Sequence, residues 1–141
     1  METPETKPKL LIVDDDPIVR QFLREALARQ SYSIEEAATG HDALCKAAQW
    51  NPDVVLLDVG LPDTDGIAVA TRLRDWTQVP IIILSSREQE ETKIAALDAG
   101  ADDYVTKPIG VGELQARIRG VLRRSRQNDS PAAAAAAGSV R

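Results

Sequence analysis

Hydrophobic residues along the chain follow two alternating patterns, short apolar runs and longer segments with helical spacing. Strand character is found in five runs, at residues 10–13, 32–37, 54–57, 81–84 and 103–108. Two of them, VVLL at 54–57 and IIIL at 81–84, are apolar throughout rather than alternating. A strand without alternation is covered on both faces, as in a parallel sheet flanked by helices. The pattern therefore predicts five strands in a largely buried sheet.

Helical periodicity marks the segments that follow each strand. We expect helices at about 17–27, 40–49, 66–73, 88–99 and 112–124. The first shows the pattern most clearly, because one apolar stripe is formed by Ile18, Val19, Phe22, Leu23, Ala26 and Leu27. Strand and helix thus alternate along the whole chain.

Residues that start and stop helices stand at the expected boundaries. Asp16 is a suitable N-cap for the first helix, and Pro17 suits its first position, where no backbone N–H is needed. Thr39 can cap the second helix. In LPDTDG, Asp63 and Asp65 are interpreted as turn formers and a helix cap. Gly100 is expected to end the fourth helix in a left-handed conformation.

This alternation predicts an α/β fold, a (βα)5 doubly wound sheet of five parallel strands. In such sheets a ligand lies at the carboxyl ends of the strands, beside the point where the strand order reverses. The residues that follow each strand are therefore the candidates for chemistry.

Composition is consistent with one soluble, cytoplasmic domain. The 141 residues, 43% of them hydrophobic, suffice for one core, and no apolar run approaches the roughly 18 residues that cross a bilayer. We expect a disordered N-terminus at 1–8, a domain at 9–125, and a linker or tail at 126–141 with no effector domain after it. A net charge of −5 argues against direct binding to nucleic acid, and the missing apolar run argues against a membrane partner. The single Cys45 is assigned no chemistry.

Polar residues follow several strands at positions where the sheet itself needs none. Asp14 and Asp15 follow the first strand, Asp58 the third, Ser85 the fourth and Lys107 the fifth. Neighbouring carboxylates repel each other and resist desolvation unless a cation offsets the cost. We therefore expect one pocket in which the three aspartates form an oxygen site suited to Mg²⁺, with Lys107 neutralising the remaining charge.

The segments LIVDDDP, VVLLDVGLPDTDG, PIIILSS and ALDAGADDYVTKP stand in an order and spacing that resembles the receiver domain of bacterial two-component response regulators. The resemblance covers about Lys9 to Arg124 and implies a flavodoxin/CheY-like fold with strand order 2-1-3-4-5. It also implies that Asp58 accepts a phosphoryl group from a cognate histidine kinase. The implied Mg²⁺ ligands are Asp14, Asp15, Asp58 and the backbone carbonyl of Gly60. The implied phosphoryl contacts are Ser85, the backbone of Ser86, and Lys107, which a cis bond would join to Pro108.

Helix four, strand five and helix five, within about residues 88–124, resemble one branch of this family, in which the receiver precedes a winged-helix DNA-binding domain. LPDTDG, SSREQEETKIAALDAGADDY and GVGELQARIRGVLRR look most like regulators of the potassium-transport (Kdp) operon. This resemblance implies a regulatory domain rather than an enzyme. It would control transcription through a DNA-binding domain that is not in this chain.

The resemblance also implies a switch and a dimer. On phosphorylation Ser85 would move inward and Tyr104 would occupy the space it leaves. The implied homodimer uses helix four, strand five and helix five, with salt bridges between subunits pairing Lys93 with Glu113, Asp103 with Arg117, and Asp102 with Arg124. The apolar centre of that interface would be Ile94, Leu97 and Ala116.

Two readings from other functional classes stay open. The first is a phosphatase of the haloacid dehalogenase type with Asp58 as nucleophile, but that chemistry uses a second acid two residues later, where Gly60 stands. The second is a pseudo-receiver that mediates protein contacts without being phosphorylated. All five expected pocket positions are filled, which disfavours it.

Overall fold

The strands and helices alternate as the apolar pattern predicts. The computed structural model describes residues 7–86 and 90–129. Within them the elements are β1 (Lys9–Val13), α1 (Pro17–Ala28), β2 (Ser33–Ala37), α2 (Gly40–Trp50), β3 (Val54–Asp58), α3 (Gly66–Arg74), β4 (Ile81–Ser85), α4 (Glu90–Asp98), β5 (Asp103–Thr106) and α5 (Val111–Asp129). All neighbouring strands are parallel, in the order β2-β1-β3-β4-β5. The predicted fold and strand order are confirmed.

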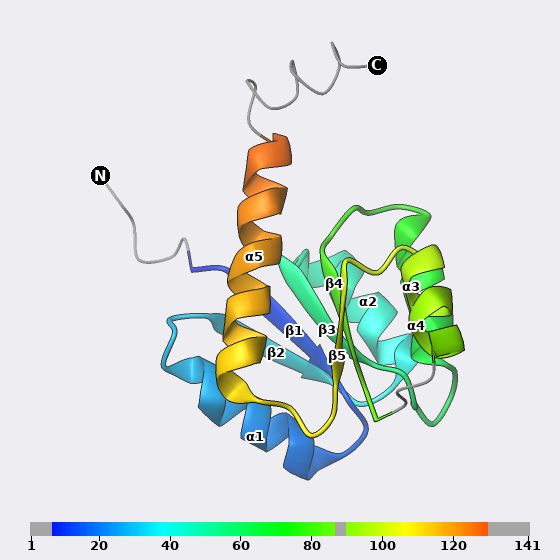
Figure 1. Ribbon diagram of the computed structural model, residues 1–141, viewed down its shortest axis with the longest axis horizontal. Helices are drawn as coiled ribbons and strands as arrows, with labels where there is room; N and C mark the ends of the chain where they lie inside the picture. The colour runs from blue at the N-terminus through cyan, green and yellow to red at the C-terminus, as the bar shows by residue number, and fades with distance from the viewer. Residues whose placement is uncertain (1–6, 87–89, 130–141) are drawn as a thin grey trace.

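Two apolar layers hold the helices against the sheet. Successive side chains of a strand point to opposite faces, so Leu11 and Val13 pack with α2, α3 and α4, whereas Leu10 and Ile12 pack with α1 and α5. Figure 1 shows α1 and α5 on one side of the sheet and the other three helices on its far side. Coverage of both faces explains why β3 and β4 are buried along their whole length.

The predicted helix boundaries are confirmed where their capping residues are concerned. Asp16 accepts a hydrogen bond from the backbone N–H of Ile18 at 2.9 Å, and Thr39 caps α2 through the N–H of Asp42 at 3.0 Å. Asp65 caps α3. Gly100 adopts φ +107°, the left-handed conformation expected at the end of α4.

The predicted apolar stripe of α1 is only half right. Leu23 and Leu27 are buried and Val19 packs beside them, but Ile18 and Phe22 are 75% and 46% exposed. The buried residues follow one line of spacing four along the helix, and the exposed ones follow the adjacent line, turned by about 100°. The face of α1 that packs against the sheet is therefore narrower than the apolar residues of the helix predict.

Some sequence predictions fall at the edges of the described chain. The helix expected to end at 124 continues through Asp129. The expected start of α4 at 88, the first six residues of the segment 1–8, and residues 130–141 of the expected tail all lie outside the described residues. In the part that the structure describes, no helix combines the length and apolar character needed to cross a bilayer.

Candidate functional site

The three aspartates predicted to converge do so at the carboxyl end of the sheet. β1 and β3 are neighbours with Val13 beside Leu57, so the next residues, Asp14 and Asp58, lie side by side. Oxygen atoms of Asp14, Asp15 and Asp58 all lie within 4.8 Å of one another. Asp14 and Asp58 are buried, while Asp15 is exposed. The cluster thus combines two buried carboxylates with one that is open to solvent.

Lys107 supplies the positive charge that this cluster requires. Its ammonium group donates to Asp14 Oδ2 at 3.0 Å and to Asp58 Oδ1 at 3.1 Å. Its backbone N–H donates to the carbonyl of Ser85 at 2.8 Å, which ties the end of β5 to the end of β4. The bond to Pro108 is cis, as the resemblance implies. The long side chain therefore reaches across the end of β4 to two aspartates whose strands lie further along the sheet.

Burial and charge act in opposite directions on these groups. Burial raises the pKa of Asp58, the negative charge of Asp14 raises it further, and Lys107 only partly opposes the rise. Burial alone would lower the pKa of Lys107, but its hydrogen bonds to Asp14 and Asp58 outweigh that effect and raise it. One ammonium group faces three carboxylates, so the site retains a net attraction for a cation.

The loop that carries Asp14 and Asp15 is fixed by its own polar groups. The N–H of Asp14 donates to the carbonyl of Ala37 at 3.1 Å, and its Oδ1 accepts from the N–H of Asp16 at 2.9 Å. Its carbonyl oxygen accepts from Arg20 Nη1 at 2.6 Å. Arg20 was not predicted from the sequence, because the sequence around an arginine on a surface helix does not indicate which carbonyl it will contact. The backbone of the acidic loop is thus held from two elements, β2 and α1.

The loop after Asp58 is closed at its base and tied to α2. The N–H of Gly66 donates to the carbonyl of Val59 at 2.7 Å, and a Cβ at this glycine would lie 2.1 Å from the carbonyl oxygen of Asp58. Asp63 accepts from the N–H groups of Gly40 at 2.8 Å and His41 at 2.9 Å, and these bonds lower the pKa of Asp63. Gly60, the predicted carbonyl ligand, is exposed within this anchored loop.

The predicted phosphoryl and switch residues lie on β4 and β5. Ser85 is buried at the end of β4, one position beyond the residue paired with Asp58, and Ser86 is exposed. Tyr104 is half-buried against the core on the α4 side, with the ammonium group of Lys93 5.8 Å from its ring centroid. The positions suit the predicted roles without testing them.

Several charges predicted to bridge two subunits are paired within one chain here. Both oxygens of Asp103 accept from Arg117 Nη1 at 3.0 Å, and Glu113 accepts from the same guanidinium at 3.0 Å. Arg74 Nη2 donates to Asp102 at 2.9 Å. The apolar side chains predicted at the centre of the interface, Ile94 and Leu97, are about half exposed, and Ala116 is exposed as well. The interface itself remains a prediction.

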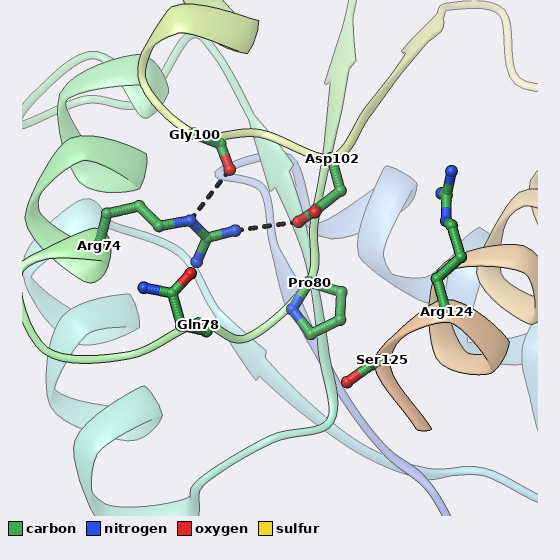
Figure 2. Close-up of a pocket in the computed structure, with 7 residues that line it drawn as sticks. All are labelled: Arg74, Gln78, Pro80, Gly100, Asp102, Arg124 and Ser125. Atoms are coloured by element: carbon green, nitrogen blue, oxygen red, sulfur yellow. Dashed lines mark hydrogen bonds and ion pairs between the residues drawn. The ribbon is translucent and has the colours of Figure 1, made fainter. Parts of the chain in front are cut away.

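A cavity of about 670 Å³ opens at the opposite, amino-terminal end of β4 and β5. Figure 2 shows Arg74 in it, donating to the carbonyl of Gly100 and to Asp102, with the exposed Arg124 on the other wall. The guanidinium of Arg74 is already neutralised by Asp102. This cavity therefore lies apart from the acidic cluster and takes no part in its chemistry.

The acidic cluster fits Mg²⁺ by its donor set. Mg²⁺ binds hard oxygen ligands, commonly one or two carboxylates together with waters and phosphate oxygens. Asp15 and Asp58 offer such carboxylates, Asp14 lies beside them, and Gly60 offers a carbonyl two residues after Asp58. A carboxylate held next to both an ammonium group and a cation site can accept a phosphoryl group, because both cations offset the charge of the incoming anion.

Comparisons with known proteins give the same picture. A family model described as the response regulator receiver domain matches residues 10–119. Over 122 residues, 86% of this chain and 54% of the other, the sequence is 52% identical to the KDP operon transcriptional regulatory protein KdpE of Escherichia coli (strain K12). The chain spans about half the length of the curated relatives it matches.

Solved structures share the fold. A putative response regulator from Chloroflexus aurantiacus J-10-fl superposes with a TM-score of 0.80 at 36% identity, over 84% of this chain and 99% of that one. The BeF3-activated receiver domain of Klebsiella pneumoniae RstA gives 0.79 at 35% identity, over 82% of this chain and 98% of that one.

Proposed function

This chain belongs to the family of response regulator receiver domains, and from that premise we propose that Asp58 accepts a phosphoryl group from a cognate histidine kinase. The observation that carries the proposal is the meeting of Asp14, Asp15 and Asp58 within 4.8 Å, with the Lys107 ammonium group bonded to two of them. A sheet gains no stability from crowding three carboxylates at one edge. The arrangement is explained by a divalent cation, whose positive charge would offset the carboxylates and the phosphoryl group that Asp58 accepts.

The proposed transfer forms an O–P bond and breaks an N–P bond. An Asp58 oxygen attacks the phosphorus of a phosphohistidine, and the electron pair of the breaking bond returns to the imidazole nitrogen. When bound, Mg²⁺ supplies positive charge to the phosphoryl oxygens. Lys107 holds Asp58 in place and neutralises part of the added charge, and the hydroxyl of Ser85 and the backbone of Ser86 contact the phosphoryl group.

We expect Asp15→Ala to weaken Mg²⁺ binding and leave the fold intact. Wild type should gain one phosphoryl group from acetyl phosphate only when Mg²⁺ is present. The variant should require at least about tenfold more Mg²⁺. Its metal-free stability should be equal or higher, because one of three like charges is gone. Intact-mass spectrometry across a Mg²⁺ series, with thermal unfolding alongside, measures both.

Asp16→Ala is the matched control for this loop. Asp16 caps α1 through its side chain, so its removal should cost about 1 kcal/mol of stability and leave the Mg²⁺ requirement unchanged. Asp15→Ala should therefore change the Mg²⁺ requirement without loss of stability, and Asp16→Ala should lower the stability without changing the Mg²⁺ requirement. A normal Mg²⁺ requirement in Asp15→Ala would remove Asp15 from the site.

Phosphorylation is proposed to act as a population shift in the cytoplasm. Ser85 and Tyr104 rearrange together, and the face made of α4, β5 and α5 then pairs with a second copy. In a full-length protein like the KdpE regulators, this pairing would bring two DNA-binding domains together, with potassium transport as the regulated process. This chain would make no contact with DNA.

Dimerisation through this face predicts that Arg117→Glu stays monomeric. Beryllofluoride with Mg²⁺ should double the mass of the wild type in sedimentation, since a related receiver is known in a BeF3-activated form. Arg117 also binds Asp103 and Glu113 in its own chain, so the glutamate variant disturbs local pairing too. Ile94→Asp is the companion, because Ile94 is half exposed. A dimer in both variants would rule out the interface.

We propose a regulatory role and no catalytic turnover. Gly60 stands where a phosphatase of the haloacid dehalogenase type would need its second acid, two residues after Asp58. Glycine has no acidic side chain, so no general acid stands at that position to protonate a leaving alcohol. Hydrolysis of p-nitrophenyl phosphate over many turnovers would contradict this assignment.

A further inference from the structure

Arg20 makes a contact with the acidic cluster that its charge does not explain. This residue lies in the first turn of α1, and its side chain is about one-fifth exposed. Nη1 donates to the carbonyl oxygen of Asp14 at 2.6 Å, and Nε donates to Glu36 Oε1 at 3.0 Å. Glu36 belongs to β2, so the guanidinium joins β2, α1 and the end of β1.

The contact completes the fixation of Asp14. The N–H group of Asp14 is held by Ala37, and its two carboxylate oxygens accept from Asp16 and Lys107. Arg20 takes the remaining polar group, the carbonyl. That carbonyl begins the peptide unit leading to Asp15, the exposed carboxylate of the cluster. The orientation of this carbonyl therefore fixes the plane of the peptide that joins Asp14 to Asp15.

We infer that Arg20 is a positioning residue for the cation site, holding the peptide between Asp14 and Asp15 so that both carboxylates face Asp58. The inference rests on the proposed Mg²⁺ site and concerns how its affinity is reached. A planar guanidinium with donors in fixed directions can bridge Glu36 and a carbonyl at once, which a single ammonium nitrogen cannot do equally well. Outer partners of this kind commonly change metal affinity by an order of magnitude or more.

The sign of the effect separates positioning from simple electrostatics. Arg20 carries a positive charge close to a site for a positive ion. If charge alone mattered, removing it would relieve repulsion and make Mg²⁺ bind more tightly. If Arg20 orients the loop, removing it makes Mg²⁺ bind more weakly. The two explanations predict opposite changes in the same dissociation constant.

Arg24 offers a matched control on the same helix. It is also paired with Glu36, through Nε and Oε2, and its other hydrogen bond goes to the carbonyl of Ile34 at 3.4 Å. Arg20→Gln and Arg24→Gln therefore remove the same charge, and each leaves Glu36 one arginine partner. Both arginines lower the pKa of Glu36, Arg24 more strongly, so this carboxylate stays ionised in either variant at neutral pH.

The experiment is a Mg²⁺ titration of the unphosphorylated protein followed by amide NMR, with thermal unfolding of the metal-free protein. We expect the Kd of Arg20→Gln to rise about tenfold, that of Arg24→Gln to stay within about twofold, and their unfolding temperatures to agree. Arg20→Lys keeps the charge and should bind as weakly as Arg20→Gln.

Three outcomes would overturn the inference. Tighter or unchanged Mg²⁺ binding in Arg20→Gln would show that Arg20 acts through charge or not at all. Equal weakening in Arg20→Gln and Arg24→Gln would assign the effect to Glu36 or to helix stability. A wild type that binds no Mg²⁺ would overturn the proposed cation site and this inference with it, which distinguishes that failure from the other two.

Discussion

Asp58→Asn should abolish labelling by acetyl phosphate. The wild type, incubated with acetyl phosphate and Mg²⁺, is expected to gain an acid-labile phosphoryl group that hydroxylamine removes. The asparagine variant has no carboxylate oxygen to attack phosphorus, although its side chain keeps nearly the same shape. We therefore expect the signal to fall to background, measured by intact mass and by hydroxylamine treatment. Undiminished labelling would eliminate Asp58 as the acceptor.

Asp53→Asn is the control for this substitution. Asp53 precedes β3 directly and accepts from the backbone N–H of Lys9 at 2.7 Å, at the opposite end of the strand from Asp58. The same chemical change at that end should leave labelling intact. Loss of labelling in both variants would point to a damaged strand instead of a missing nucleophile.

Stability gives an independent measure of the same residue. The pKa of Asp58 is raised in the folded protein, so the unfolded chain loses this proton more readily. Ionised Asp58 therefore costs stability above its folded pKa, and the cost disappears as the pH falls below its ordinary value of 3.8. Asp58→Asn should raise the unfolding temperature of the metal-free protein at pH 7, and the gain should shrink in acid.

Lys107→Met should produce the second large effect, a loss of stability of ~2 kcal/mol at pH 7. Removing one partner of a buried ion pair leaves the other charges uncompensated, which costs about 3 to 5 kcal/mol in fully buried cases. The lysine side chain here is 24% exposed, so we expect less. Methionine keeps most of the aliphatic length, and the loss can be assigned to the ammonium group. Chemical denaturation measures it.

Acid and Mg²⁺ should each restore part of that stability. In the variant the pKa of Asp58 should rise further, because Lys107 is the group that opposes its rise. Lowering the pH then neutralises Asp58 at a higher pH than in the wild type, and added Mg²⁺ supplies positive charge where the ammonium group is missing. In the wild type, Lys107 depends on pH in the opposite direction to Asp58. Its raised pKa contributes stability at neutral pH, and this contribution is lost as the pH rises through that pKa.

Lys46→Met is the surface control for this experiment. Lys46 lies 3.9 Å from Glu35 and 3.6 Å from Asp42, and all three side chains are about one-third to one-half exposed. Exposed pairs of this kind contribute ~0 to 1 kcal/mol. We expect a small loss that neither acid nor Mg²⁺ restores. An equal response in both variants would show that Lys107 is an ordinary surface lysine.

The largest error in the sequence prediction concerns α1. Ile18 and Phe22 have the spacing of a buried stripe, yet they face solvent because the apolar layer on the sheet takes only the line of Val19, Leu23 and Leu27. Periodicity gives the direction of a helical face but not its width. That width depends on the neighbouring elements, here β1, β2 and α5, which no local pattern describes.

Charged side chains were the other residues that local pattern could not place. Asp103 and Arg117 are bonded to each other within one chain, and their pairing across two subunits stays a prediction. Arg20 was missed as a contact of Asp14. Long charged side chains can reach several partners at similar free energy, so sequence separation leaves the choice open. Only the packing of helix against strand fixes it.

Local sequence patterns were enough to predict the alternation of strands and helices, the capping residues, and the polar groups at the end of each strand, because periodicity and capping depend on residues within a few positions of each other. Which of those polar groups meet depends on how the strands pair. Asp14 and Asp58 become neighbours since β1 and β3 pair in register, and Lys107 reaches both across β4. Arg20 joins them from a helix packed against the same sheet. Contacts between such distant segments follow from strand order and packing, which no local stretch of sequence specifies.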